Sequence, residues 1–531
     1  MHNLPIEIYD TTLRDGTQGS GFSLTSEDKV AVAKRLDAFG VDVIEGGWPG
    51  SNPKDAAFFE MMKSVRLQFA RLAAFGMTRR KGGIAETDAN LNALLDAQTP
   101  IVTLVGKSWT LHVTEALGAT LEENLAMIGE SVAYLHTQGR EVFYDAEHFF
   151  DGYRADPEYA LETLRAAAEA GATRLVLCDT NGGSLPATIA EVTLRVAQTF
   201  DVMIGIHTHN DAELAVANAL ASIEAGARQV QGTINGYGER AGNLNLISVI
   251  PALKFKLAYP QPQDLTRLRE LARYIDERAN MQPNIRAPYV GDAAFAHKGG
   301  MHVSAVNKNP ETYEHIPPEW VGATRQVLLS DLSGRANVLA KSAGGTPEEA
   351  SAVVERLKEL EHRGYAFEGA EASFTLMSQK VRGTYRPYFS LHGYRVTLDK
   401  REGDHEPLCE ASVRVEVGGQ LEHTAASGDG PVNALDQALG KALQRFYPSL
   451  ASLKLTDYKV RVLFGAEIGT ASVIRVQVET SDGVDTWGTV GASTDIIDAS
   501  YSALIDAIEY KLFKDHIVPH AVPQLVETEA V

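Results

Sequence analysis

The chain has 531 residues, with 49 Lys or Arg and 69 Asp or Glu, which gives a formal net charge of −20 and a pI of about 5.2. This length predicts three or four domains, the acidic charge argues against binding to nucleic acid, and two cysteines exclude a disulfide framework or a cysteine-based zinc cluster. The chain has no uninterrupted apolar run of about 18 residues and its start does not resemble a targeting signal, so we expect a cytoplasmic protein that does not enter a membrane.

The first 255 or so residues alternate short β-rich runs with amphipathic segments typical of helices. The predicted strands are 6–12, 41–48, 69–77, 101–107, 141–149, 174–180, 203–210 and 229–236, and helices between them include 26–39, 121–138, 158–170, 186–199 and 213–225. Eight such strands over about 250 residues predict an α/β fold, a (β/α)8 TIM barrel, which we assign to residues 1–260. The alternative is an open doubly wound sheet, but that fold predicts a glycine-rich phosphate turn after the first strand, and this chain lacks one.

The rest of the chain is organised differently. Residues 261–395 lose the alternation and are interpreted as helical linker subdomains that could cover an active site. Residues 396–517 contain an internal repeat of strands, a small-residue turn and a helix, which predicts an α+β domain of two related units. Such a pair can form a ligand cleft, a dimerisation module or both, and residues 518–531 are interpreted as a tail.

Two histidines at the end of the seventh strand are the first candidate site. Because strand side chains alternate, His207 and His209 share one face and can bind one metal ion, although paired histidines also occur without a ligand. Asp15 follows the first strand and Asn243 follows the eighth, so both are expected at the same end of the barrel. These four side chains leave two positions on an octahedral divalent ion for a 2-oxo acid. Arg14 could polarise its keto oxygen or form a structural ion pair.

The glycine-rich stretch Gly236–Gly242 does not have the spacing or position of a dinucleotide-binding turn. Its glycines are expected instead to allow a tight turn that brings Asn243 to the site. The chain has neither a phosphate-binding P-loop nor a serine nucleophile elbow.

Several motifs together resemble one enzyme family. Leu13-Arg14-Asp15-Gly16-Thr17-Gln18, followed after ten residues by Lys29, resembles the first signature of the α-isopropylmalate, homocitrate and citramalate synthases, and His207-x-His209-Asn210-Asp211 resembles the second. The second signature usually has glycine where this chain has Glu213. The resemblance covers nearly the whole chain, and the segments 45–55 and 309–316 most resemble the citramalate synthase branch.

The resemblance implies a role for each matching residue. It assigns a divalent metal (Mg, Mn or Zn) to Asp15, His207, His209 and Asn243, and substrate binding to Arg14, Leu104, Tyr144 and Thr180. It further implies that Glu147 assists enolisation or positions acetyl-CoA, that His302 is the catalytic base, and that Tyr313 is its hydroxyl partner. Strict alternation places Tyr144 and Glu147 on opposite faces, so Tyr144 reaches the pocket only if its strand bends.

The implied reaction is a Claisen-type condensation of acetyl-CoA with pyruvate, followed by thioester hydrolysis, in isoleucine synthesis. Such an enzyme is an acyltransferase and is expected to be a homodimer or larger, with isoleucine as a feedback inhibitor bound near Asp429, Gly430, Pro431, Asp495 and Ile496. Three alternatives remain at this stage: a sister synthase making 2-isopropylmalate or homocitrate, a metal-dependent acyl-CoA lyase, and an amino-acid sensor without activity.

Overall fold

The computed structural model describes residues 4–328, 346–402, 406–463 and 472–520. The chain divides into two compact units, one made of residues 1–295 and 314–325, the other of residues 296–313 and 326–531.

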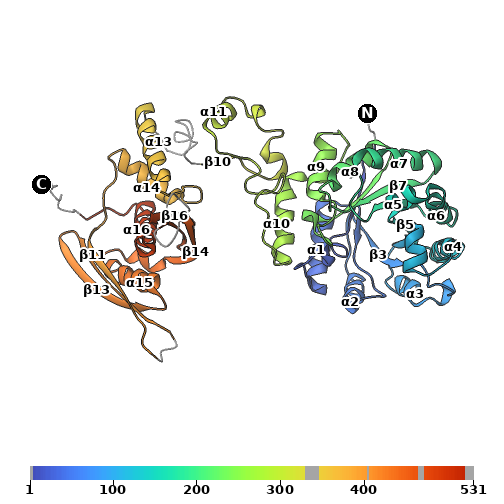
Figure 1. Ribbon diagram of the computed structural model, residues 1–531, viewed down its shortest axis with the longest axis horizontal. Coiled ribbons are helices and arrows are strands. Elements are labelled where there is room, and N and C mark those ends of the chain that lie inside the picture. Colours follow the sequence, from blue (N-terminus) through green and yellow to red (C-terminus); the bar gives the residue numbers. More distant parts are fainter. Residues whose placement is uncertain (1–3, 329–345, 403–405, 464–471, 521–531) are drawn as a thin grey trace. The chain divides into compact units, whose positions relative to one another are not determined.

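The first unit contains a closed barrel of eight parallel strands, as predicted (Figure 1). Each strand pairs with the next, and the eighth closes the barrel on the first. The strands are β1 (Glu7–Asp10), β2 (Val43–Glu45), β3 (Arg71–Met77), β4 (Ile101–Lys107), β5 (Glu141–Glu147), β6 (Arg174–Asp179), β7 (Met203–Thr208) and β8 (Gln229–Gly232). Most end a few residues earlier than predicted, and the residues that follow them form loops at the carboxyl end of the barrel.

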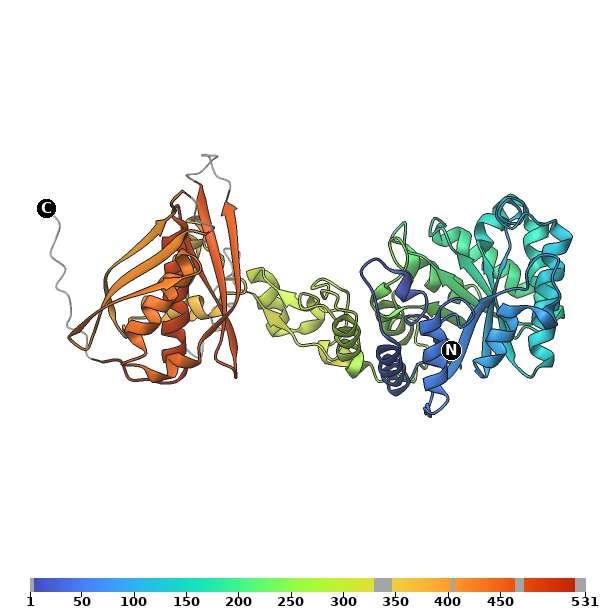
Figure 2. The same cartoon turned by 90° about the horizontal axis from the view of Figure 1, so that it is seen from below.

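Helices surround the barrel (Figures 1 and 2). They are α1 (Ser26–Phe39), α2 (Pro53–Met62), α3 (Ala89–Asp96), α4 (Leu121–Thr137), α5 (Phe149–Ala155), α6 (Pro157–Glu169), α7 (Pro186–Thr199), α8 (Ala215–Glu224), α9 (Leu246–Phe255) and α10 (Leu268–Arg278). Local sequence explains several boundaries: Thr25 and Asp28 form a reciprocal capping box at the start of α1, and Gly40 ends it in a left-handed conformation with φ 96°.

Alternation along the strands decides which side chains enter the barrel. One layer inside the barrel is apolar and buried, and it consists of Tyr9, Val43, Ala73, Ile101 and Phe143. Nearer the amino ends of the strands, Arg71 forms ion pairs with Glu7 and Glu141. Residues of the opposite parity pack outward against the helices in the main core. Two residues beyond the apolar layer most inward positions are polar, among them Glu45 and Asp145, and they lie toward the carboxyl end of the barrel, where active sites of this fold are found.

The second unit begins with helical segments and ends with the predicted repeat. Its helices α11 (Gly300–Lys308), α13 (Pro347–His362) and α14 (Glu371–Val381) are accompanied by the short strands β9 (Ala296–His297) and β10 (Gln326–Val327). Two antiparallel three-stranded sheets follow. The first contains β11 (Ser390–Asp399), β12 (Leu408–Val417) and β13 (Gln420–Gly428), and the second contains β14 (Lys454–Leu463), β15 (Val473–Ser481) and β16 (Thr486–Ser493).

Each sheet is followed by one helix, α15 (Pro431–Leu443) or α16 (Ile496–Lys514), and the two helices lie between the sheets (Figure 2). One contact occurs at the same place in both copies: the hydroxyl of Thr424 donates to the Ala438 carbonyl, and that of Thr489 donates to the Ala503 carbonyl, each at 2.8 Å. The repeat seen in the sequence is therefore a repeat in structure.

Candidate functional site

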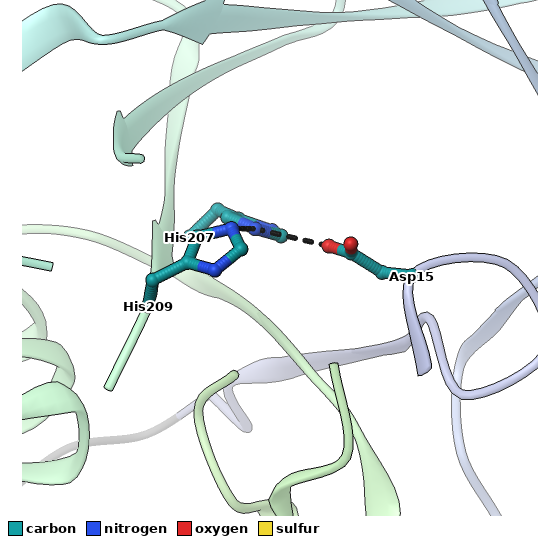
Figure 3. A group of neighbouring side chains, drawn as sticks. All are labelled: Asp15, His207 and His209. Carbon is teal, nitrogen blue, oxygen red and sulfur yellow. Dashed lines mark hydrogen bonds and ion pairs between the residues drawn. The ribbon is translucent and has the colours of Figure 1, made fainter. Parts of the chain in front are cut away.

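Asp15, His207 and His209 meet at the carboxyl end of the barrel (Figure 3). His207 Nε2 lies 3.3 Å from Asp15 Oδ2 and 3.4 Å from His209 Nε2, and all three residues are at most 6 % exposed. Asp15 is held in the turn after β1, where its backbone N–H donates to the Thr11 carbonyl. The fold therefore brings together three side chains separated by almost 200 residues, and their ligand atoms lie within 4.8 Å of one another.

Asn243 joins this group through Asp15. Its Nδ2 donates to Asp15 Oδ2 at 2.6 Å, and its buried Oδ1 has no partner among the described residues. The glycine-rich turn makes this position possible, because a Cβ on Gly238 would lie 2.6 Å from Asn243 Oδ1 and Gly242 adopts φ 95°. The turn thus serves the site by close backbone packing, as expected from the sequence.

The charges of the trio suit a divalent cation. Burial opposes ionisation of Asp15, but the adjacent Arg14 guanidinium and His207 hold the pKa of Asp15 well below its usual range. Burial and the neighbouring His207 lower the pKa of His209 to about 3, so its imidazole is neutral at physiological pH. Burial also disfavours the charged form of His207, yet its contact with Asp15 raises its pKa overall. A carboxylate beside two imidazoles, with unpartnered His209 Nδ1 and Asn243 Oδ1 nearby, fits a site for one divalent metal ion.

Arg14 is fixed by a buried carboxylate that sequence reasoning did not single out. Glu45, at the end of β2, accepts a hydrogen bond from Arg14 Nε at 2.6 Å and others from the hydroxyls of Tyr9 and Thr11. The guanidinium carbon lies 3.8 Å from the centre of the Phe75 ring. Arg14 therefore forms an ion pair and still faces the cavity, so the two interpretations offered from sequence are compatible.

A cavity of about 230 Å³ opens beside the trio. Its lining includes Arg14, Asp15, Gln18, Trp48, Phe75, Met77, Val105, Lys107, Asp145, Glu147, Cys178, Thr180, His207, His209, Glu239 and Arg240. Thr180 Oγ1 accepts from the backbone N–H of His148 at 2.9 Å, which leaves the Thr180 hydroxyl proton available to another acceptor. Glu147 forms an ion pair with Lys107, a residue of the cavity lining that sequence reasoning also missed.

Leu104 and Tyr144 lie elsewhere than expected. Both are fully buried in the core between the barrel strands and the surrounding helices, and neither lines the cavity. The inward positions at this level are Val105 on β4 and Asp145 on β5, because β5 continues its alternation without the bend that Tyr144 would need.

His302 and Tyr313 belong to the second unit. Their rings stack at 4.1 Å between centroids and 25° between planes, and Tyr313 is 46 % exposed. The two side chains are in contact through their rings, while the hydroxyl partnership and the part in catalysis that the resemblance implied stay predictions.

The predicted regulatory residues lie at the starts of α15 and α16. Asp495 caps α16, and its carboxylate accepts from the backbone N–H groups of Ile497 and Asp498. Those donors are therefore already bound, which removes the free N–H groups on which the prediction for Asp495 and Ile496 rested. At α15, Gly430 is the N-cap without a side-chain cap, Pro431 follows it, and the N–H of Asp429 donates to Asn433.

No helix in the described part of the chain is both long and apolar enough to span a membrane.

Known proteins and family models match nearly the whole chain. Family models match it in three segments: HMGL-like over residues 5–275, homocitrate synthase post-HMGL domain-like over 289–364, and LeuA allosteric (dimerisation) domain over 368–512. It is 54 % identical to the (R)-citramalate synthase of Geobacter sulfurreducens, over 96 % of this chain and 98 % of that protein. The (R)-citramalate synthase of Aquifex aeolicus is 52 % identical over the same shares of both chains. A probable 2-isopropylmalate synthase of Methanopyrus kandleri is 34 % identical, over 95 % of this chain and 97 % of that protein.

Proposed function

The chain belongs to the (R)-citramalate synthases of the HMGL-like family, and we infer that it catalyses acetyl-CoA + pyruvate + H2O → citramalate + CoA + H⁺. The observation that carries this function is an identity of 46–54 % to five such synthases over almost the full chain. The barrel-end trio and the adjacent cavity supply the chemistry that the reaction needs.

Asp15, His207 and His209 would hold a divalent metal ion, with Asn243 as a fourth ligand through Oδ1 after its amide turns. Hard oxygen ligands favour Mg or Mn, while the two imidazoles also suit Zn. When bound, such an ion supplies Lewis-acid polarisation of a keto group.

Arg14 and Thr180 would bind pyruvate from two sides of the cavity. Arg14, oriented by Glu45, can donate to the keto oxygen and to the alkoxide that forms when the acetyl carbon attacks. The Thr180 hydroxyl, which already accepts from His148, can donate to the substrate carboxylate. The cavity of about 230 Å³ favours a small keto acid.

The acetyl group must lose a methyl proton to become the nucleophile. His302, stacked on Tyr313, is proposed as the base that takes this proton, and Glu147, paired with Lys107, as a group that positions the thioester. Water then cleaves the thioester bond and CoA leaves as the thiol. This hydrolysis drives the overall reaction toward citramalate.

The second unit is proposed to regulate the enzyme and to hold a homodimer together. The match of residues 368–512 to an allosteric (dimerisation) domain supports both roles. Because citramalate leads toward isoleucine, isoleucine is the proposed inhibitor. The proposed domains are the barrel at residues 1–260, the linker subdomains at 261–395, the regulatory domain at 396–517 and the tail at 518–531.

The test is the release of free CoA from acetyl-CoA with pyruvate, 2-oxoisovalerate or 2-oxoglutarate as the second substrate. A citramalate synthase is most efficient with pyruvate, by about 10-fold or more in kcat/KM, since one or two methylenes are worth about 1–3 kcal/mol. Greater efficiency with 2-oxoisovalerate or 2-oxoglutarate would instead identify the sister synthase.

A further inference from the structure

Gln231 is a fully buried amide next to a proposed metal ligand. It lies on β8, where the register pairs it with His207 of β7, and none of its surface is exposed. Its Oε1 lies 3.0 Å from His207 Nδ1, and its Nε2 donates to Asp145 Oδ1 at 3.1 Å. A buried chain of hydrogen bonds thus runs from β5 through β8 to the imidazole on β7.

The direction of the hydrogen bonds in this series is set by Asp145. An ionised carboxylate can only accept, so it requires the NH2 group of Gln231 on its side. Burial and the charge of Glu45 raise the pKa of Asp145 to about 7, and a proton carried on its other oxygen still leaves Oδ1 an acceptor. The carbonyl oxygen of the same amide must then face His207, and this oxygen can only accept. The proton of the His207 ring is therefore drawn to Nδ1, and Nε2 retains its lone pair.

The lone pair of Nε2 points at the place where a cation is needed. Nε2 lies 3.3 Å from Asp15 Oδ2 and 3.4 Å from His209 Nε2, so three electron-rich atoms converge. When the ring is neutral these atoms repel one another, and a cation among them removes this repulsion. Metal-binding histidines commonly donate their second N–H to a partner that fixes ring and tautomer.

We propose that Gln231, oriented by Asp145, is a positioning residue that holds His207 in the Nδ1–H tautomer and so prepares its Nε2 to bind the metal. The proposal rests on the metal site of the proposed function and adds two residues to its support. It concerns where the proton sits on a neutral ring, and it requires no change of charge.

The experiment measures Mn²⁺ affinity of metal-free, full-length protein by isothermal titration. Gln231→Leu removes the acceptor at similar volume, and we expect its affinity to fall about 10- to 100-fold. Gln229→Leu is the matched control, because Gln229 lies on the same strand, is equally buried, and donates to Glu7 rather than contacting a histidine. Its Mn²⁺ affinity should equal that of the wild type.

A paired exchange tests the acceptor itself. In Gln231→Glu with Asp145→Asn, the new carboxylate accepts from both His207 and the new amide. The hydrogen bond between positions 145 and 231 reverses, but the acceptor that faces His207 Nδ1 is kept, so affinity should stay within a few-fold of wild type. Gln231→Glu alone places two carboxylates together and should lose affinity. Selective ¹⁵N-histidine NMR of the metal-free wild type, at a pH high enough to leave the His207 ring neutral, should show the His207 proton on Nδ1, and Gln231→Leu should show a mixture of tautomers.

Unchanged Mn²⁺ affinity in Gln231→Leu, or an equal loss in Gln229→Leu, would overturn the positioning role. So would a paired exchange that binds no better than Gln231→Glu alone. Failure of the proposed metal site has a different signature, because the wild type would then bind Mn²⁺ no more tightly than His207→Ala. Thermal unfolding of each variant shows that the proteins compared are folded.

Discussion

Glu213 adopts a left-handed backbone conformation, with φ 60°. The related signature usually has glycine at this position, and the structure explains why, since a residue with a Cβ is strained there by about 1–2 kcal/mol. The Glu213 side chain is exposed and lies beyond His209, so the departure affects the turn and leaves the site geometry intact.

We expect Glu213→Gly to raise the free energy of unfolding by about 1 kcal/mol or less, because relief of strain is partly offset by the entropy of glycine in the unfolded chain. Urea titration followed by circular dichroism measures this change. A lower stability for Glu213→Gly would show that the glutamate side chain makes a stabilising contact.

Asp10 is a fully buried carboxyl whose partner is Thr12, which donates to it from both backbone and hydroxyl. Burial, only partly opposed by these bonds, raises the pKa of Asp10 to about 7 from 3.8. The folded state thus binds the proton more tightly than the unfolded state. The resulting stabilisation is complete below about pH 3.8 and is lost as the pH rises through 7.

Asp10→Asn should remove this dependence. The unfolding free energy of the wild type, relative to the variant, is expected to fall by up to about 4 kcal/mol between pH 4 and pH 7, since one pKa unit is worth about 1.36 kcal/mol. Urea titrations of both proteins at several pH values measure the difference. Parallel pH profiles would mean that Asp10 is ionised in the folded protein throughout.

The site residues that could be predicted from the sequence are those that lie in short motifs. Arg14 and Asp15 are adjacent, and His207 and His209 occupy one strand end, so the barrel rule alone brings them together. Glu45 was missed because it is a single polar residue in the apolar strand β2, and Gln231 because it is one of two glutamines on β8 that belong to no recognisable motif. The inward parity of Glu45, two residues past Val43 of the apolar layer, and the pairing of Gln231 with His207 on the next strand are the signals that could have identified them.

Among the elements, β4 offers a direct test of inward and outward positions. Val105 lines the cavity, whereas Leu104 packs outward in the core. Val105→Ala makes room for one further methylene, so we expect it to shift substrate preference from pyruvate toward 2-oxobutyrate by about 10-fold. Steady-state CoA release with each keto acid measures this preference as a ratio of catalytic efficiencies.

Leu104→Ala is the matched control on the same strand. It should lower the unfolding free energy by about 2–5 kcal/mol through a core cavity, with the preference between the two substrates unchanged. If Leu104→Ala changed the preference and Val105→Ala did not, the pocket role predicted for Leu104 would stand.

At the same scale, strand order and helix positions in the barrel could be predicted because each strand is a short apolar run between helix-like segments. The expected pocket role of Tyr144 depended on a bend in β5 that no residue type announces, and β5 has none. The alternation of side chains along β5 therefore predicted the orientation of Tyr144 better than the resemblance to the enzyme family did.

In the whole molecule, regulation should depend on the second unit. We expect isoleucine to weaken substrate binding to the full chain by about 5- to 150-fold, the usual range of allosteric coupling. A chain that ends at residue 395 should lose this inhibition, as steady-state CoA release with and without isoleucine would show. Full activity of the intact enzyme in the presence of isoleucine, leucine and valine would leave the domain as a dimerisation module only.

The central claim is that the Asp15, His207 and His209 site makes this chain a metal-dependent citramalate synthase. The most direct measurement follows citramalate formed from ¹³C-pyruvate and acetyl-CoA by NMR while Mn²⁺ or Mg²⁺ is added to metal-free enzyme. The account predicts no citramalate before metal is added, restoration of activity at about one ion per chain, and no activity in His207→Ala at any metal concentration. Citramalate formation at full rate by the chelated enzyme, or by His207→Ala, would contradict it.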